Sequence, residues 1–258
     1  MKRSAFTCLI IGILLTALGI VLVCVTRAAA LAEDASNGQK ILFALSLICT
    51  LAGILTSVAA ILPKQKPTNV RTLSMAALFA ALCYIGFTYA KIDIPVGAEK
   101  TAFHLGNVFC VLAALFLGGF WGGMAGAVGM TVADLTTAYV TSAPKTFLLK
   151  LCIGLIAGFV AHKIFKLSKD DVQRKVPLSV ATVLSCAAGM AFNIVADPLV
   201  GYFYKMYILG VPQQAASIWA KMGAVTTSVN AVVAVIAASV FYLALRPALK
   251  HSGLMPRI

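Results

Sequence analysis

Charged residues are scarce in this chain. They make up 11% of its 258 residues, whereas apolar residues make up 61% and the mean hydropathy is +0.97. A soluble domain usually carries about 25% charged residues. The composition therefore excludes a soluble globular enzyme, a disordered chain and a secreted disulfide scaffold. The apolar runs are continuous over about 20 residues, which indicates transmembrane helices rather than the short alternating segments of a membrane β-barrel.

Several chemical signatures are also missing. The seven cysteines form no C-x-x-C pair and have no histidine at metal-ligand spacing, so we interpret them as small buried apolar residues and expect no metal site. The sequence has no G-x-S-x-G, H-E-x-x-H or Walker A motif, and no pair of acids at hydrolase spacing. We therefore expect a protein that is not an enzyme and that carries no cofactor.

Eight apolar runs predict an all-α polytopic membrane protein. The polar sequence PKQKPTNVR at residues 63–71 follows the second run and contains two prolines and three basic residues. We interpret this break as the boundary between a two-helix N-terminal appendage, residues 1–66, and a six-helix core, residues 67–258. The expected helices cover residues 5–26, 41–62, 72–90, 105–120, 122–140, 146–165, 178–198 and 216–245.

Residues 1–32 have a second interpretation as a signal peptide. Lys2 and Arg3 precede the first apolar run, and AAALA at residues 28–32 resembles a cleavage site. The apolar run is long for a signal peptide, which favours retention as a membrane anchor. Either way, residue 33 emerges on the outer side.

The basic residues give the chain a formal net charge of +13 and predict its orientation. In membrane proteins, lysine and arginine concentrate in cytoplasmic loops. A cytoplasmic N-terminus puts 13 of the 21 basic residues on the inner side. This bias favours an even number of helices with both termini in the cytoplasm. No stretch combines a basic face with soluble structure, so we expect no nucleic-acid partner. We expect the protein to be surrounded by membrane lipid.

With this topology, polar side chains from five helices converge on the outer third of the membrane, and the inner halves have almost none. Polar groups inside a bilayer are costly and usually serve a function. We therefore predict a pocket that opens to the outside and has an apolar floor, not a continuous polar pore. The candidate substrate-binding residues are Asn107, Lys150, Asn193, Asp197, Lys221 and Asn230.

These polar residues also have structural interpretations. Lys150 and Lys221 can extend to the membrane interface, and the asparagines can join helices through hydrogen bonds. Asp197 precedes Pro198 and can simply end its helix. We expect Asp134 to stabilise the third core helix and to lie beside the pocket.

Aromatic side chains near the pocket are candidates for stacking on a ring. Phe87, Tyr89 and Phe103 belong to the first core helix and the loop after it. The same residues also fit an aromatic belt at the membrane interface.

Small residues form two further patterns. Gly118, Gly122 and Gly126 are four residues apart, which favours close helix packing, and GGFWGG at residues 118–123 predicts a tight turn between two helices. In the first core helix, one face carries Ala76 and Ala80, and the adjacent face carries Ala77 and Ala81. A flat alanine face can pack within the bundle or contact a partner protein, and the spacing alone does not separate these alternatives.

The core from about residue 68 to residue 248 resembles the S components of energy-coupling factor (ECF) vitamin transporters, most closely the riboflavin type. The motifs that carry the resemblance are IDIPVGA at 92–98, HLGNVF at 104–109, LFLGGFWGGMAGAVG at 115–129, ADL at 133–135, APKTFLLK at 143–150 and GLIAG at 154–158.

The resemblance implies a membrane-embedded substrate-binding subunit in the plasma membrane of a prokaryote. It implies six helices that bind one vitamin-like molecule near the outer face. It also implies partners, namely a transmembrane T component and two cytoplasmic ATPases. Ala76 and Ala80 match the alanine pair with which the family contacts the T component, and Ala77 and Ala81 offer a second register. Asn107 and the extra N-terminal helices depart from the family pattern.

Two other function classes compete with this interpretation. A stand-alone secondary transporter or channel would need polar groups through the inner half of the membrane. A membrane enzyme or assembly factor would need a reactive group of residues. The sequence offers neither feature.

Overall fold

The computed structural model describes residues 70–97, 99–168 and 176–253, together with isolated positions between residues 11 and 42. Contacts divide the chain into two compact units, Met1–Pro67 and Thr68–Ile258. The expectations for the N-terminal helices and for a cleavage site lie outside the described residues, apart from those isolated positions.

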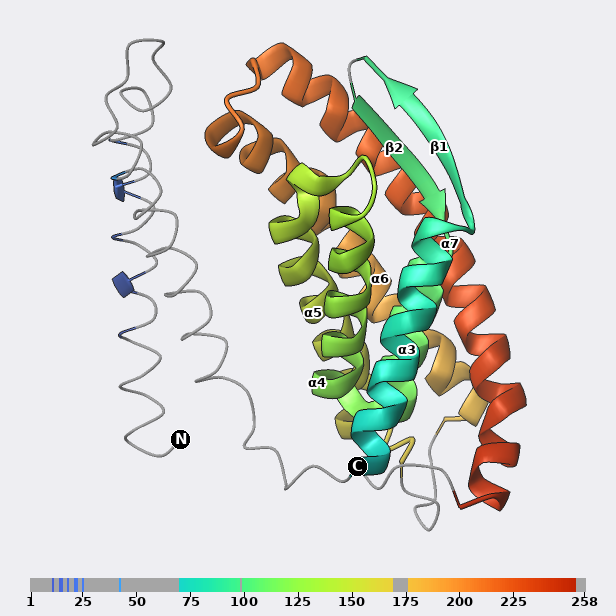
Figure 1. Cartoon of the computed structure of the whole chain (residues 1–258). Helices are drawn as coiled ribbons and strands as arrows, with labels where there is room; N and C mark the ends of the chain where they lie inside the picture. Colours follow the sequence, from blue (N-terminus) through green and yellow to red (C-terminus); the bar gives the residue numbers. More distant parts are fainter. Residues whose placement is uncertain are drawn as a thin grey trace. The chain divides into compact units, whose positions relative to one another are not determined.

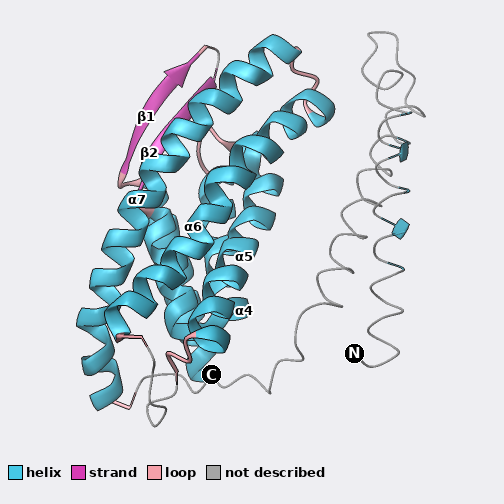
Figure 2. Cartoon of the chain, turned by 180° about the vertical axis from the view of Figure 1, so that it is seen from behind, coloured by secondary structure: helices cyan, strands magenta, loops and turns pink. Residues whose placement is uncertain are grey.

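The described part of the second unit consists of long helices and one β-hairpin (Figures 1 and 2). The main elements, in chain order, are α3 (Val70–Thr88), β1 (Lys91–Val96), β2 (Glu99–His104), α4 (Gly106–Leu135), α5 (Ala143–Phe159), α6 (Leu178–Phe203) and α7 (Gln213–His251). A 3-10 turn, η1 (Val140–Ser142), precedes α5. Two π-helical turns, η2 (Val160–Ile164) and η3 (Tyr204–Ile208), extend α5 and α6.

Five stretches of described residues are long and apolar enough to cross a membrane. Apolar side chains such as Val232, Ile236 and Val240 of α7 are exposed on the outside of the bundle, where lipid surrounds a membrane protein. The prediction of a polytopic helical membrane protein is therefore confirmed. The five stretches are Val70–Thr88, Gly106–Leu135, Val140–Ile164, Leu178–Ile208 and Gln213–His251.

Helix α4 reverses direction at Gly118. This residue has φ +82° and ψ 171°, a backbone conformation that glycine adopts without steric cost. Beyond the turn, Gly122 lies against Ala114 and Gly126 lies against Cys110, contacts that a continuous helix cannot make. Residues 106–117 and 119–135 are therefore two antiparallel arms, and the tight turn predicted from the glycine-rich sequence falls at their junction.

The glycines allow close packing on two sides of the second arm, residues 119–135. One side presents Gly122 and Gly126 to the first arm. The other side lies against α5, where Gly154 meets Gly123 and Gly158 meets the backbone of residue 119. Because glycine has no side chain, the helix backbones approach closely, and dispersion contacts hold them together in lipid.

The segment after α3 is a β-hairpin, where the sequence suggested a loop. Strands β1 and β2 pair antiparallel, with Lys91 opposite His104 and Val96 opposite Glu99. The alternation in IDIPV suits a strand, and Gly97, with φ +61°, begins the short turn between the strands. The hairpin lies at one end of the helices, beside α7, and we call this the hairpin end (Figure 1).

Helix α6 continues past Pro198, where the sequence suggested that it would end. It runs to Phe203 and is extended by η3. Asp197, in the turn before the proline, is bonded to Lys145 of α5 and to Thr227 of α7. We attribute the continuation of the helix to these contacts, which oppose the usual tendency of proline to end a helix.

The end of the bundle opposite the hairpin has a mostly apolar interior. Phe79, Phe116 and Tyr242 pack in series, with ring centroids 6.1 Å and 4.8 Å apart. The buried hydroxyls of Thr182 and Ser185 bond to carbonyls of their own helix, so they create no polar path.

The glycine contacts between α4 and α5 lead to a prediction about stability. In Gly154→Ala, the new methyl group meets the backbone of Gly123, and overpacking of this kind costs about 1–3 kcal/mol. The matched control is Gly223→Ala in α7, where the methyl group meets nothing within 4 Å. We expect thermal unfolding in detergent to shift downward for Gly154→Ala and to stay level or rise for Gly223→Ala. An increase in both variants would contradict the close packing.

Candidate functional site

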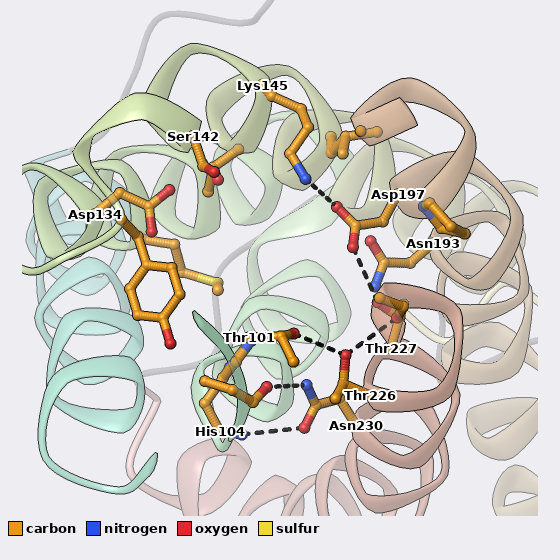
Figure 3. Close-up of a pocket in the computed structure, with 18 of the residues that line it drawn as sticks. Thr101, His104, Asp134, Ser142, Lys145, Asn193, Asp197, Thr226, Thr227 and Asn230 are labelled. Atoms are coloured by element: carbon orange, nitrogen blue, oxygen red, sulfur yellow. Dashed lines mark hydrogen bonds and ion pairs between the residues drawn. The ribbon is translucent and has the colours of Figure 1, made fainter. Parts of the chain in front are cut away.

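A cavity of about 140 Å³ lies at the hairpin end of the bundle (Figure 3). The C-terminal ends of α3, α4 and α6 meet the N-terminal ends of α5 and α7 around it, and β2 forms one wall.

Every buried amide or charged side chain in the described part of the chain lines this cavity. The other buried polar side chains there are all hydroxyl-bearing residues. This distribution agrees with the expected confinement of polar groups to one end of the bundle. The buried amide and charged residues are Asn107, Asp134, Lys150, Asn193 and Asn230.

A buried lysine joins α5 to the start of α4. Lys150 is 6% exposed, and its Nζ donates a hydrogen bond to Oδ1 of Asn107 at 2.9 Å. An ammonium group has three donor protons, so Lys150 can also donate to a ligand in the cavity. Asn107 keeps the ammonium group in place without neutralising its charge.

An ion pair joins α5, α6 and α7. Lys145 Nζ lies 2.7 Å from Oδ1 of Asp197, and the Thr227 hydroxyl donates to Oδ2 of the same carboxylate at 2.9 Å (Figure 3). Both oxygens of Asp197 therefore have a partner on a neighbouring helix, which fixes the orientation of the carboxylate in the cavity wall.

Asn230 attaches strand β2 to α7. Its Oδ1 accepts the backbone N–H of His104 and its Nδ2 donates to the carbonyl of Ala102, both at 3.0 Å. The hydroxyls of Thr101 and Thr226 are 2.9 Å apart beside it. The amide of Asn230 thus pairs with the strand as a neighbouring strand would, so this residue positions a wall of the cavity in addition to lining it.

Three buried polar atoms of cavity-lining residues have no hydrogen-bond partner among the described residues. They are Oδ1 of Asn193, Oδ2 of Asp134 and Nδ1 of His104. An unsatisfied buried polar atom costs about 1–3 kcal/mol. A ligand that bonds to these atoms would offset this cost.

The rings of Phe87, His104 and Tyr139 form an aromatic corner. The Phe87 centroid lies 4.7 Å from that of His104 and 5.5 Å from that of Tyr139. Burial, reinforced by the charge of Lys150, lowers the pKa of His104 to about 3, so this imidazole is neutral at physiological pH. Burial also raises the pKa of Tyr139, whose hydroxyl donates to Asp93 of β1 at 2.9 Å.

Most of the predicted substrate-binding residues line the cavity, but three lie elsewhere. Tyr89 is 76% exposed, and it borders a separate shallow hollow together with Phe103. Phe103 faces away because neighbouring residues of a strand point to opposite sides. Lys221 is exposed on α7. The predicted residues that line the cavity are Phe87, Asn107, Lys150, Asn193, Asp197 and Asn230.

The sequence interpretation missed several residues of the cavity wall. Lys145 belongs to the same motif as Lys150, and Thr226 and Thr227 lie about one turn before Asn230. Their nearness in the sequence to Lys150 and Asn230 was the signal that could have identified them as cavity residues. Threonine is common in membrane helices, however, so a hydroxyl alone does not mark a site. Asp134 lines the cavity itself, whereas the sequence suggested a position beside it.

The two alanine registers of α3 have different surroundings. Ala76 is 6% exposed and belongs to the apolar core, and Ala80 packs against it beside Gly129. Ala77 and Ala81 are exposed. The first register therefore packs within the bundle, and the second register faces outward.

A protein-family model described as the S component of an ECF-type riboflavin transporter matches residues 67–247. The chain belongs to this family. The resemblance seen in the sequence is thereby confirmed. No curated protein and no solved structure matches the chain.

ECF S components are the substrate-binding membrane subunits of ECF transporters, and theirs is not an enzyme family. Membership implies a vitamin ligand and association with a T component and ATPases. The S-component match begins at residue 67, so it leaves out the N-terminal unit.

The lowered pKa of His104 predicts how stability depends on pH. Below about pH 6.5 the unfolded chain protonates this histidine and the folded protein does not, so stability falls as the pH decreases. The loss between pH 6.5 and pH 5 is at most about 2 kcal/mol. We expect His104→Gln to reduce the acid-side decrease of the melting temperature. His251→Gln, at the exposed end of α7, is the control. Equal pH dependence in the parent and His104→Gln would contradict a buried neutral imidazole.

Proposed function

We propose that this S component captures riboflavin, or a flavin closely related to it, from outside a prokaryotic cell. It then delivers the flavin with the help of a T component and two ATPases. The observation that carries this proposal is the confinement of all buried amide and charged side chains of the described residues to one cavity.

The chemistry of the cavity suits a flavin ring. A flavin ring is planar and aromatic, and its edge carries carbonyl groups beside an N–H group. The aromatic corner of Phe87, His104 and Tyr139 offers flat apolar contact. Lys150 can donate to a ring carbonyl, and the unpaired Oδ2 of Asp134 can accept the ring N–H.

The apolar interior below the cavity supports a binding subunit over a stand-alone transporter or channel. A substrate that crossed the bundle would have to displace the packed rings of Phe79, Phe116 and Tyr242. Delivery by movement of the whole subunit needs no polar path. An enzyme or assembly factor has no supporting observation here.

The two arms of α4 support a core of six transmembrane helices with the hairpin end outside. With the hairpin end outside, the sequence puts 13 of its 21 basic residues on the inner side. This bias is the one expected if the opposite end and both termini lie in the cytoplasm.

For the T component we propose the outward register of α3 as the contact surface. Ala77 and Ala81 are exposed, as are Leu73 and Leu78 next to them. Small side chains on an apolar face admit a partner helix at close range. This proposal replaces the buried register of Ala76 and Ala80.

Riboflavin should bind to the purified protein in detergent, as measured by quenching of flavin fluorescence. Lys150→Met removes a buried donor, and we expect it to weaken binding by roughly 5- to 150-fold. Lys163→Met, at the opposite end of the bundle, should bind like the parent. The proposal fails if the folded parent binds no flavin, or if Lys150→Met binds as tightly as the parent.

Replacing both Ala77 and Ala81 with leucine should reduce co-purification with the T component and the ATPases, because the added bulk holds the partner helix away. Flavin binding should be unaffected. The matched control is Ala244→Leu, at an exposed alanine of α7. Full co-purification of the double variant would exclude this face of α3.

A further inference from the structure

We infer that the face of α6 that carries Asn193 and Asp197 binds the hydroxylated side chain of the flavin. These two residues would then determine specificity for flavins that carry a polyol chain. The inference rests on the proposed flavin-binding function and adds the orientation of the ligand within the cavity.

The two residues form a pair of acceptors on one helix. They are four residues apart, so they share a face of α6 and are separated by about 6 Å along its axis. Asn193 is 1% exposed, and its Oδ1 has no hydrogen-bond partner among the described residues. This acceptor atom belongs to a residue of the cavity wall, so a donor on the ligand can satisfy it.

Asp197 adds acceptors that are already held in place. Its two oxygens receive hydrogen bonds from Lys145 and Thr227, at 2.7 Å and 2.9 Å. A carboxylate has about four lone-pair sites in total, so each oxygen can accept one more bond. Because partners from α5 and α7 fix the group, the ligand loses little free energy in ordering it.

Hydroxyl groups are the donors that fit this pair. A polyol carries O–H groups on successive carbons, and each of them can donate and accept. Such a chain can lie along α6 and donate to Asn193 and Asp197 in turn. The hydroxyls of Thr227 and Thr146 are further lining groups that can exchange hydrogen bonds with it.

The division of the cavity into two sides orients the ring. The aromatic corner belongs to α3, β2 and the segment after α4, whereas α6 contributes only Asn193, Asp197, Pro198 and Gly201 to the wall. Figure 3 shows Asp134 on one side of the cavity and the Asn193 and Asp197 pair on the other. A flavin that stacks its ring in the aromatic corner therefore directs its chain toward α6.

The experiment compares riboflavin with lumiflavin, which has the same ring but a methyl group in place of the polyol chain. Both are titrated by fluorescence quenching against the purified parent and Asn193→Leu, a variant of similar shape without the acceptor. We expect the parent to prefer riboflavin. We expect Asn193→Leu to lower riboflavin affinity by roughly 5- to 150-fold and lumiflavin affinity by no more than about twofold.

Two further variants separate a specific contact from a general disturbance. Asn193→Asp keeps an acceptor oxygen at the same place and should retain more of the preference for riboflavin than Asn193→Leu does. Lys150→Met, which removes the donor proposed for a ring carbonyl, should weaken both flavins. Thermal unfolding without ligand checks that each variant is folded.

The outcomes distinguish this inference from the function on which it rests. If folded Asn193→Leu loses affinity for both flavins equally, or if the parent does not prefer riboflavin, the chain lies elsewhere and the inference is overturned, while flavin binding stands. If the folded parent binds neither flavin, the proposed function fails and the inference fails with it.

Discussion

The cost of an unpaired polar group in a bilayer is the constraint on which this structure depends. Lipid offers no hydrogen bonds, so each amide or charge needs a partner inside the protein. The chain meets most of this demand by gathering such groups at one end, where Lys150 bonds to Asn107 and Lys145 pairs with Asp197. Oδ1 of Asn193 and Oδ2 of Asp134 have no described partner there. The rest of the bundle relies mainly on close apolar packing, to which glycine contacts between α4 and α5 contribute.

The same contacts that stabilise the bundle also build the cavity. Asp197 joins three helices, and its carboxylate is part of the wall. Asn230 holds β2 against α7 and thereby closes one side. A substitution at either position therefore changes both stability and the shape of the site. Asn193 differs from them, because its acceptor oxygen has no described protein partner.

The sequence was most informative where a residue type conflicts with its surroundings. An asparagine or lysine inside an apolar run stands out, so Lys150, Asn193 and Asn230 could be found without a structure. The hairpin was missed because its strands are short and amphipathic. Tyr89 and Phe103 illustrate a second limit, since nearness in sequence does not give the direction of a side chain. The two alanine registers of α3 differ by one residue, and only the packing against α4 separates the buried register from the exposed one.

The short first arm of α4 keeps one end of the site inside the protein. Its twelve residues, 106–117, rise only about 18 Å, whereas the hydrocarbon layer is about 30 Å thick. The arm can be this short because neighbouring helices, not lipid, surround it. Asn107, near its start, is 2% exposed, and Lys150 bonds to it there. In such a buried place the effective dielectric constant is low, so the charge of Lys150 acts on a bound molecule far more strongly than it would at a water-exposed mouth.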